Sequence, residues 1–272
     1  MIDRSGRVFG LAACFCLATV TTAAAVEIAP HRALYSLTLA ATKSSSGVVA
    51  ASGGMAYEWG ETCDGWTVQQ RFRLRLQYAE QDNVVISSNL VTWEAKDGLH
   101  YRFNERRQRN GEADEEIKGE AALNGVGKGG TAEFTRPQTA NLVLAPGVLF
   151  PTAHTLVLIE RAQAGDQFVS RKVFDGASVE NAGQITAVIG PALQPTVASA
   201  DDKLPSSPLL NRPSWRIRLA FFPADGKSEQ PDYELGMRLL DNGVSQDMTL
   251  DYSDYVIRAK LDQIEPLPRP SC

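Results

Sequence analysis

The segment from Trp66 to Tyr78 alternates apolar and polar residues along its whole length. Its apolar side is formed by Trp66, Val68, Phe72, Leu74, Leu76 and Tyr78, and its other side by Thr67, Gln69, Arg71, Arg73, Arg75 and Gln77. Successive side chains of a β-strand point to opposite faces, so this pattern predicts a long strand with one dry face and one charged face. Such a strand must bury its dry face against other elements, which requires a large β layer.

The same alternation recurs along most of the chain, with turn signals between the runs. The apolar members of the other runs are Tyr35, Leu37 and Leu39; Val91, Trp93 and Ala95; Tyr101 and Phe103; Trp215, Ile217, Leu219 and Phe221; and Tyr255, Ile257, Ala259 and Leu261. The turn pairs are Asp64-Gly65, Asp97-Gly98, Asn110-Gly111, Asp225-Gly226 and Asn242-Gly243. Because such pairs tolerate the positive φ of tight hairpins, neighbouring strands are predicted to be antiparallel. We therefore predict a mainly β fold, a meander that rolls into a barrel or spiral or stacks as a sandwich.

One segment breaks the period of two. Pro151 near its start and Gly165 at its end are typical of a helix, here of about three turns. A lone helix in an antiparallel β protein usually covers the concave side of the sheet, so we expect it there. Packed core is the simpler interpretation of the apolar residues nearby, and a pocket beneath the helix is the alternative. The candidate pocket-lining residues are Phe72, Leu74, Trp93, Leu156, Ile159 and Trp215.

The span from Pro191 to Pro213 is rich in Pro, Ser and Asp. Its composition predicts a solvated loop. Strand patterns of one kind continue on both sides of it, which argues against a linker between domains. We therefore predict a single β domain over residues 26–272.

Residues 1–25 have the order of a secretory signal peptide. Arg4 and Arg7 give a basic start, residues 8–20 are apolar, and Ala23-Ala24-Ala25 fits the small-residue cleavage pattern. The apolar run is shorter than the about 20 residues that span a bilayer, and no other run approaches that length. An alternative is a lipid-modified Cys14, but cleavage there leaves almost no apolar segment before the cut. We expect export to the periplasm and no transmembrane segment in the mature chain.

Charge narrows the class of partner. The formal net charge of the whole chain is −5 at pH 7. An acidic chain with mixed charges is not expected to bind nucleic acid, and the sequence shows no polybasic patch for anionic lipid head groups. The expected partners are proteins, apolar ligands or both.

Two of the four cysteines, Cys14 and Cys16, lie within the predicted signal peptide, which leaves Cys63 and Cys272. An even pair in an exported protein favours a structural disulfide over a metal site or a reactive thiol. A bridge across so long a loop stabilises a fold by about 5 kcal/mol in the chain-entropy model. A redox switch remains the alternative, because a cysteine at a chain end is easily reached.

No catalytic or metal-binding motif stands out. His31, His100 and His154 are not spaced as metal ligands. A G-x-S-x-G motif is absent from the sequence, although geometry rather than sequence order defines a Ser-His-Asp triad. Four acidic residues lie across a turn from Arg106, Arg107 and Arg109, which predicts ion pairs on a hairpin; they are Glu112, Asp114, Glu115 and Glu116. We expect no enzymatic activity, no cofactor and no metal.

The chain resembles the EipB cell-envelope-integrity family of alphaproteobacterial periplasmic proteins. The likeness spans nearly the whole mature chain and lies in residues 29–37, 54–58, 61–66 and 144–155 and in the terminal cysteine. The resemblance implies a large antiparallel β-spiral or half-barrel, with a shape similar to lipoprotein carriers and a helix against its inner face. It also implies a Cys63–Cys272 disulfide, no catalytic residues, and a role in maintaining the envelope under stress.

The first functional hypothesis is therefore a non-enzymatic periplasmic protein that maintains cell envelope integrity under stress by binding other envelope proteins. The alternative is a periplasmic carrier of acyl chains, lipids or lipoproteins, in which the helix swings away from a dry pocket. An envelope hydrolase is a third class, and it would depend on His100 or His154.

Overall fold

The structure is a computed structural model that describes residues 26–43, 46–179, 182–195, 205–224 and 226–272. The predicted signal peptide, residues 1–25, lies outside the described residues. Within them the chain forms fourteen strands, one α-helix and one 3₁₀ helix. The strands are β1 (His31–Thr42), β2 (Val48–Glu61), β3 (Gly65–Tyr78), β4 (Val84–Ala95), β5 (His100–Arg109), β6 (Glu112–Leu123), β7 (Gly130–Arg136), β8 (Ala140–Leu144), β9 (Phe168–Val173), β10 (Gly183–Leu193), β11 (Ser214–Phe222), β12 (Tyr233–Leu240), β13 (Ser245–Asp251) and β14 (Tyr255–Pro266). The helices are α1 (Pro151–Gln163) and η1 (Pro208–Leu210).

The strands form one sheet with the order β8-β7-β6-β5-β4-β3-β2-β1-β14-β13-β12-β11-β10-β9. The chain begins in the middle of this order, where β1 pairs with both β2 and β14. Hairpins then run outward to the edge strand β8, α1 carries the chain to the opposite edge strand β9, and hairpins return to β14. All these strand pairs are antiparallel, as the turn signals predicted. In the turn between β5 and β6, Asn110 and Gly111 have positive φ angles of 55° and 85°.

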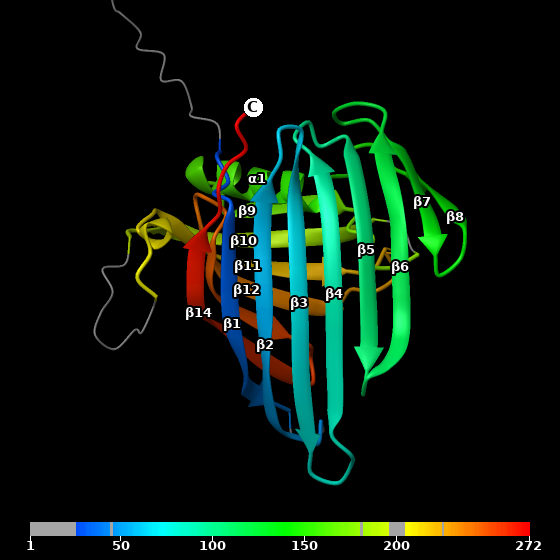
Figure 1. Ribbon diagram of the computed structural model, residues 1–272, viewed down its shortest axis with the longest axis vertical. Helices are drawn as coiled ribbons and strands as arrows, with labels where there is room; N and C mark the ends of the chain where they lie inside the picture. Colours follow the sequence, from blue (N-terminus) through cyan, green and yellow to red (C-terminus); the bar gives the residue numbers. More distant parts are fainter. Residues whose placement is uncertain (1–25, 44–45, 180–181, 196–204, 225) are drawn as a thin grey trace, which may run out of the picture.

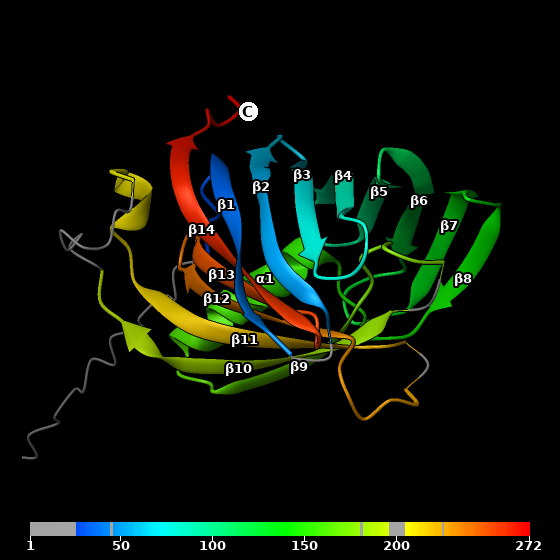
Figure 2. The same ribbon diagram turned by 90° about the horizontal axis from the view of Figure 1, so that it is seen from below.

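The sheet is curved but not closed, which confirms the predicted half-barrel. In Figure 1 the strands β1 to β6 run lengthwise at the front, and β9 to β12 cross behind them. Figure 2 shows the sheet curling around α1, which lies on its concave face. The sheet edges β8 and β9 are not paired with each other. The short segment before α1 lies beside β9 there, through a parallel bridge between Leu149 and Val173.

Three apolar clusters fill the concave side. One surrounds α1 and joins Leu158 and Ile159 to Trp215 and Ile217 of β11. A second covers the inner face where β1, β2, β3 and β14 meet. The third contains five aromatic residues, Tyr101, Phe103, Phe134, Phe150 and Phe174, packed among aliphatic ones. Most of these residues are the apolar members of alternating runs, so the pattern of period two determines which face of each strand is buried.

Strand β4 differs from the sequence prediction. Val91, Trp93 and Ala95 were expected to face the core. Ala95 is buried, as expected, but Val91 is 43% exposed, whereas Thr92 and Glu94 are 9% and 2% exposed. Glu94 lies opposite the buried Trp66, and Trp93 lies opposite Thr67. In this register Thr92 and Glu94 of β4 therefore face the core, and Trp93 faces outward.

The predicted loop from Pro191 to Pro213 begins later than expected. Strand β10 continues through Pro191 to Leu193, because the register with β11 shifts between Ile189 and Ala192. A proline is tolerated at such an irregularity, where the ladder of hydrogen bonds is already broken. Across the described part of the chain, none of the helices has both the length and the apolar character needed to cross a membrane.

Candidate functional site

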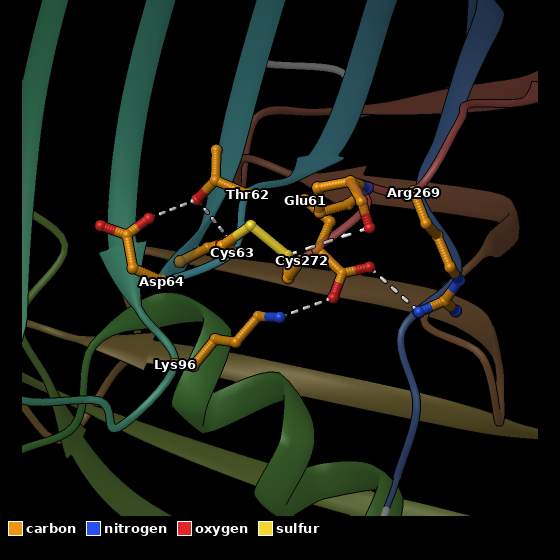
Figure 3. Close-up of a disulfide and its surroundings, with 9 residues drawn as sticks. Glu61, Thr62, Cys63, Asp64, Lys96, Arg269 and Cys272 are labelled. Atoms are coloured by element: carbon orange, nitrogen blue, oxygen red, sulfur yellow. Dashed lines mark hydrogen bonds and ion pairs between the residues drawn. A yellow bond between two sulfur atoms is a disulfide. The ribbon is translucent and has the colours of Figure 1, made fainter.

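The two cysteines among the described residues form a disulfide. Cys63, in the turn between β2 and β3, is bonded to Cys272, with an S–S distance of 2.10 Å and a Cα–Cα distance of 5.7 Å. The two residues are 209 positions apart, and both are exposed. The turn is held by Thr62, whose hydroxyl lies 2.9 Å from Oδ1 of Asp64 and 3.0 Å from the carbonyl oxygen of Gly65. The disulfide therefore fixes the end of the chain to a rigid turn (Figure 3).

An ion-pair network beside the disulfide joins both ends of the described chain. Glu61 at the end of β2 accepts hydrogen bonds from Nζ of Lys96 at 2.8 Å and from Nη1 of Arg269 at 3.0 Å. Arg269 also pairs with Glu27 at 2.9 Å and donates to the carbonyl oxygen of Ile28 at 3.0 Å. The side chain of Glu61 is only 9% exposed, so the pairing is better shielded from solvent than a surface ion pair. Figure 3 shows the network and the disulfide side by side.

The N-terminus of α1 is held by a buried carboxylate from β4. The residue before the helix, Phe150, offers no side-chain hydrogen bond, and Pro151 occupies the first turn. Glu94 replaces the missing cap: its two carboxylate oxygens accept hydrogen bonds from the backbone N–H groups of Thr152 and Ala153, each at 2.7 Å. A carboxylate satisfies free N–H groups and interacts favourably with the helix dipole at this end. Glu94 thus attaches α1 to the inner face of the sheet.

Burial changes the acidity of this anchor. Desolvation raises the pKa of Glu94 from 4.5 to about 7, and the bonds from Thr152 and Ala153 offset only part of the effect. Tyr101 is the cross-strand neighbour of Glu94 and donates its own hydroxyl to the carbonyl oxygen of Asp175 at 2.9 Å. A carboxyl with a pKa of about 7 changes its charge close to neutral pH, so the contact with α1 is linked to proton uptake.

The segment before α1 is also tied to β9. Leu149 donates its backbone N–H to the carbonyl oxygen of Lys172 at 2.9 Å and accepts from the N–H of Phe174 at 3.0 Å. His154, in the first turn of α1, is 5% exposed, and its Nε2 has no hydrogen-bond partner. Burial, with a smaller effect from Arg171, lowers the pKa of His154 to about 4. His154 is therefore uncharged at neutral pH and packs as a structural residue of the helix.

The other two histidines have different surroundings. His31 is 1% exposed, and its Nδ1 lies 2.7 Å from the carbonyl oxygen of Ala29. His100 is exposed at the start of β5. Among the residues that the structure describes, no group of three or more His, Cys, Asp or Glu side chains is placed to hold a metal ion.

The structure distributes the six candidate pocket residues over three places. Leu156, Ile159 and Trp215 belong to the cluster around α1, whereas Phe72 and Leu74 belong to the cluster at β1, β2, β3 and β14. Ile159 and Leu74 are 0% and 1% exposed, so they pack in the core. Trp93 is not with them: it lies under the guanidinium of Arg102, 4.9 Å from the ring centroid. That arginine is on the outer face, with its side chain 69% exposed.

Sequence reasoning missed Glu94. Its neighbours Val91, Trp93 and Ala95 look like the dry side of a strand, which assigned Glu94 to the outer face. One signal was available, because Pro151 begins a helix with no Ser, Thr, Asp or Asn directly before it. The free N–H groups of such a helix require an acceptor from elsewhere, but sequence alone does not say which residue provides it.

Comparisons with known proteins agree on one family. A family model described as EipB-like matches residues 22–268. The cell envelope integrity protein EipB of Brucella abortus (strain 2308) is 32% identical over 249 residues, which cover 90% of this chain and 86% of that protein. A crystal structure of a β-barrel-like protein of domain of unknown function DUF1849 from Brucella abortus is also similar. It has a TM-score of 0.82 and 30% identity, over 90% of this chain and 100% of the other.

Proposed function

The chain belongs to the EipB-like family, and we propose that it maintains the integrity of the cell envelope under stress as a non-enzymatic protein of the periplasm. In this proposal the signal peptide directs export, and the folded half-barrel acts by binding other envelope proteins. The observation that carries the proposal is the 32% identity to a cell envelope integrity protein over 90% of the chain.

The architecture is consistent with a binding scaffold. The inner face is filled by α1 and its apolar cluster, with Ile159 and Ala187 both 0% exposed. The Cys63–Cys272 disulfide joins Cys272 to the turn between β2 and β3, and Arg269 pairs with Glu27 near the start of the described chain. A sheet of this size presents its outer face and its edge strands β8 and β9 to partners.

Deletion of the gene tests the proposed role. The deletion strain should become sensitive to detergents and to antibiotics that act on the cell wall, and a plasmid copy should restore resistance. A copy without residues 1–25 stays in the cytoplasm and should fail to restore it. Unchanged resistance in the deletion strain would contradict the envelope role, and rescue by the leaderless copy would contradict the periplasmic location.

A carrier of lipids, acyl chains or lipoproteins is the second candidate, and the position of α1 favours it. The helix lies on the concave face, and the sheet edges β8 and β9 are not paired with each other. Movement of α1 would uncover Ala187, Trp215, Ile217 and their neighbours on the sheet as a dry groove. Gly147, with a φ of +81°, lies before the helix and offers a hinge.

Native mass spectrometry of protein purified from its own periplasm tests the carrier, and absence of both bound lipid and acyl-probe uptake rejects it. A cross-link adds a sharper test. A Cβ built on Gly98 lies 3.5 Å from Cβ of Ala153, within the range for a disulfide. In the oxidised Gly98→Cys/Ala153→Cys variant α1 cannot leave, so a carrier should lose probe uptake. Gly98→Cys alone is the control and should keep it. Equal uptake by the two would reject a mobile helix.

A further inference from the structure

A row of three arginines on the outer face of β3 has no partner of opposite charge. Arg71, Arg73 and Arg75 alternate with buried or half-buried residues, and all three are exposed. Alternate residues of a strand lie on one face about 7 Å apart, so the three guanidinium groups form one line of positive charge. None of them forms an ion pair with any residue that the structure describes.

Several other arginines of the sheet are paired across strands. Arg32 pairs with Glu58 and Glu265, Arg102 with Glu120, Arg106 with Glu116, and Arg218 with Glu234 and Asp251. The neighbours of the arginine row are different. On β2 they are Ala56, Gly54 and Ser52, and on β4 they are Asn89, Ser87 and Val85. The row is thus a local concentration of charge that the fold does not neutralise.

The positive surface continues beyond β3. Arg75 pairs with Ser52 of β2, Ser52 with Thr38 of β1, and Thr38 with Arg258 of β14. Arg258 is exposed and lies three strands from Arg75, which is about 14 Å at the usual strand spacing. The acidic side chains around this surface are already engaged or lie at its margin. Glu58 and Glu116 are paired, Asp262 accepts a hydrogen bond from Ser36 at 3.3 Å, and Asp247 lies opposite Lys260.

We propose that the arginine row, with Arg258, docks the protein on a membrane surface that displays anionic lipid phosphates. Guanidinium groups bind phosphate through two parallel hydrogen bonds, and they do so on an open surface. A protein partner would require a desolvated apolar or aromatic anchor at the centre of the patch. Small and polar residues occupy that centre, so a lipid surface fits it better.

This inference goes beyond the proposed function, and it departs from the expectation from the sequence that the chain has no polybasic patch for anionic lipids. The net charge of −5 describes the whole chain and does not show this local row of unpaired arginines. A local concentration of positive charge is attracted to an anionic surface and orients the molecule on it. Such docking would hold an envelope-binding scaffold at the membrane.

Vesicle flotation tests the proposal. The chain without its predicted signal peptide is mixed with vesicles of phosphatidylcholine, with or without phosphatidylglycerol. It should float only with the anionic vesicles, and binding should fall as salt screens the charges. Each basic residue near such a surface strengthens binding about five-fold, so Arg71→Gln/Arg73→Gln/Arg75→Gln should lower the partition coefficient about 100-fold.

Two matched variants separate this row from general charge. Arg102→Gln/Arg212→Gln/Arg218→Gln removes the same charge from arginines paired elsewhere and should keep most of the binding. Arg71→Lys/Arg73→Lys/Arg75→Lys keeps the charge but loses the two parallel hydrogen bonds of each guanidinium group, so its binding should fall between that of the wild type and that of the glutamine variant. Equal losses in the two glutamine variants, equal binding to both kinds of vesicle, or no binding by the wild type would overturn the proposal. So would a lysine variant that binds no better than the glutamine variant of the row.

Discussion

Glu94 links the charge of one side chain to the position of α1. Burial raises its pKa from 4.5 to about 7, so the folded protein holds this proton over a pH range in which the unfolded chain has lost it. The stabilisation from this proton is complete below pH 4.5 and is lost as the pH rises through about 7. Across that window it amounts to about 3 kcal/mol of unfolding free energy.

Glu94→Gln should therefore flatten the dependence of the melting temperature on pH between about 4.5 and 7. The amide is neutral at every pH, and it still accepts one of the two hydrogen bonds from the start of α1. Melting followed by circular dichroism across this range measures the slope. Glu133→Gln, which removes an exposed carboxylate of β7, is the control and should keep the wild-type slope. Parallel pH profiles for Glu94→Gln and the wild type would rule out the linkage.

For single residues, the alternating pattern predicted correctly which side chains are buried in β1. The same pattern failed in β4, where polar residues face inward. Tyr35 and Leu37 of β1 are buried as expected. In β4 the apolar Val91 and Trp93 face outward, because Glu94 is needed inside to hold α1 and Trp93 is covered by Arg102. The sequence of β4 does not show that a helix far along the chain needs an acceptor for its free N–H groups. The inward position of Glu94 could therefore not be predicted from that sequence.

The helix is the element that closes the concave side, and Ile159 is its fully buried contact. Ile159 is 0% exposed and packs in the cluster with Trp215 and Ile217. Ile159→Ala should lower the unfolding free energy by about 2–5 kcal/mol, through lost burial and the cavity left behind. Urea unfolding measures the loss. Glu160→Ala, at the exposed neighbouring position, should change stability by about 0.5 kcal/mol or less. If the two variants unfold alike, α1 does not stabilise the concave face.

Elements were predictable wherever local chemistry marks their ends. Pro151 and Gly165 bracket the helix in the sequence, and α1 spans Pro151–Gln163, with Gly165 at a φ of +83°. Strand β10 passes Pro191 because a shift in the register with β11 accommodates it. That shift depends on a neighbouring strand, so the beginning of the loop could not be read from its proline content.

For the whole molecule, the turn signals predicted an antiparallel meander, but they did not predict that α1 carries the chain from the edge strand β8 to the opposite edge strand β9. The hairpins are local, whereas the pairing of β1 with β14 joins the two ends of the domain in the middle of the sheet. That pairing leaves β8 and β9 as the two edge strands of the sheet. The alternation along a single strand does not indicate which distant strand it pairs with. The family resemblance, rather than periodicity, identified a half-barrel instead of a closed barrel or a sandwich.

The Cys63–Cys272 disulfide affects the stability of the whole fold, because it closes a loop between residues that are 209 positions apart in the unfolded chain. Cys63→Ser/Cys272→Ser should lose about 5 kcal/mol of unfolding free energy, since the unfolded ensemble regains the entropy that the loop removed. At this chain length the loss corresponds to a melting temperature lower by about 10–20 °C. Wild-type protein in reducing agent is the matched control and should melt with the variant, which itself should not respond to reductant. Equal melting of the oxidised wild type and the double variant would mean that the bond adds no stability, and would favour a redox role for the exposed pair.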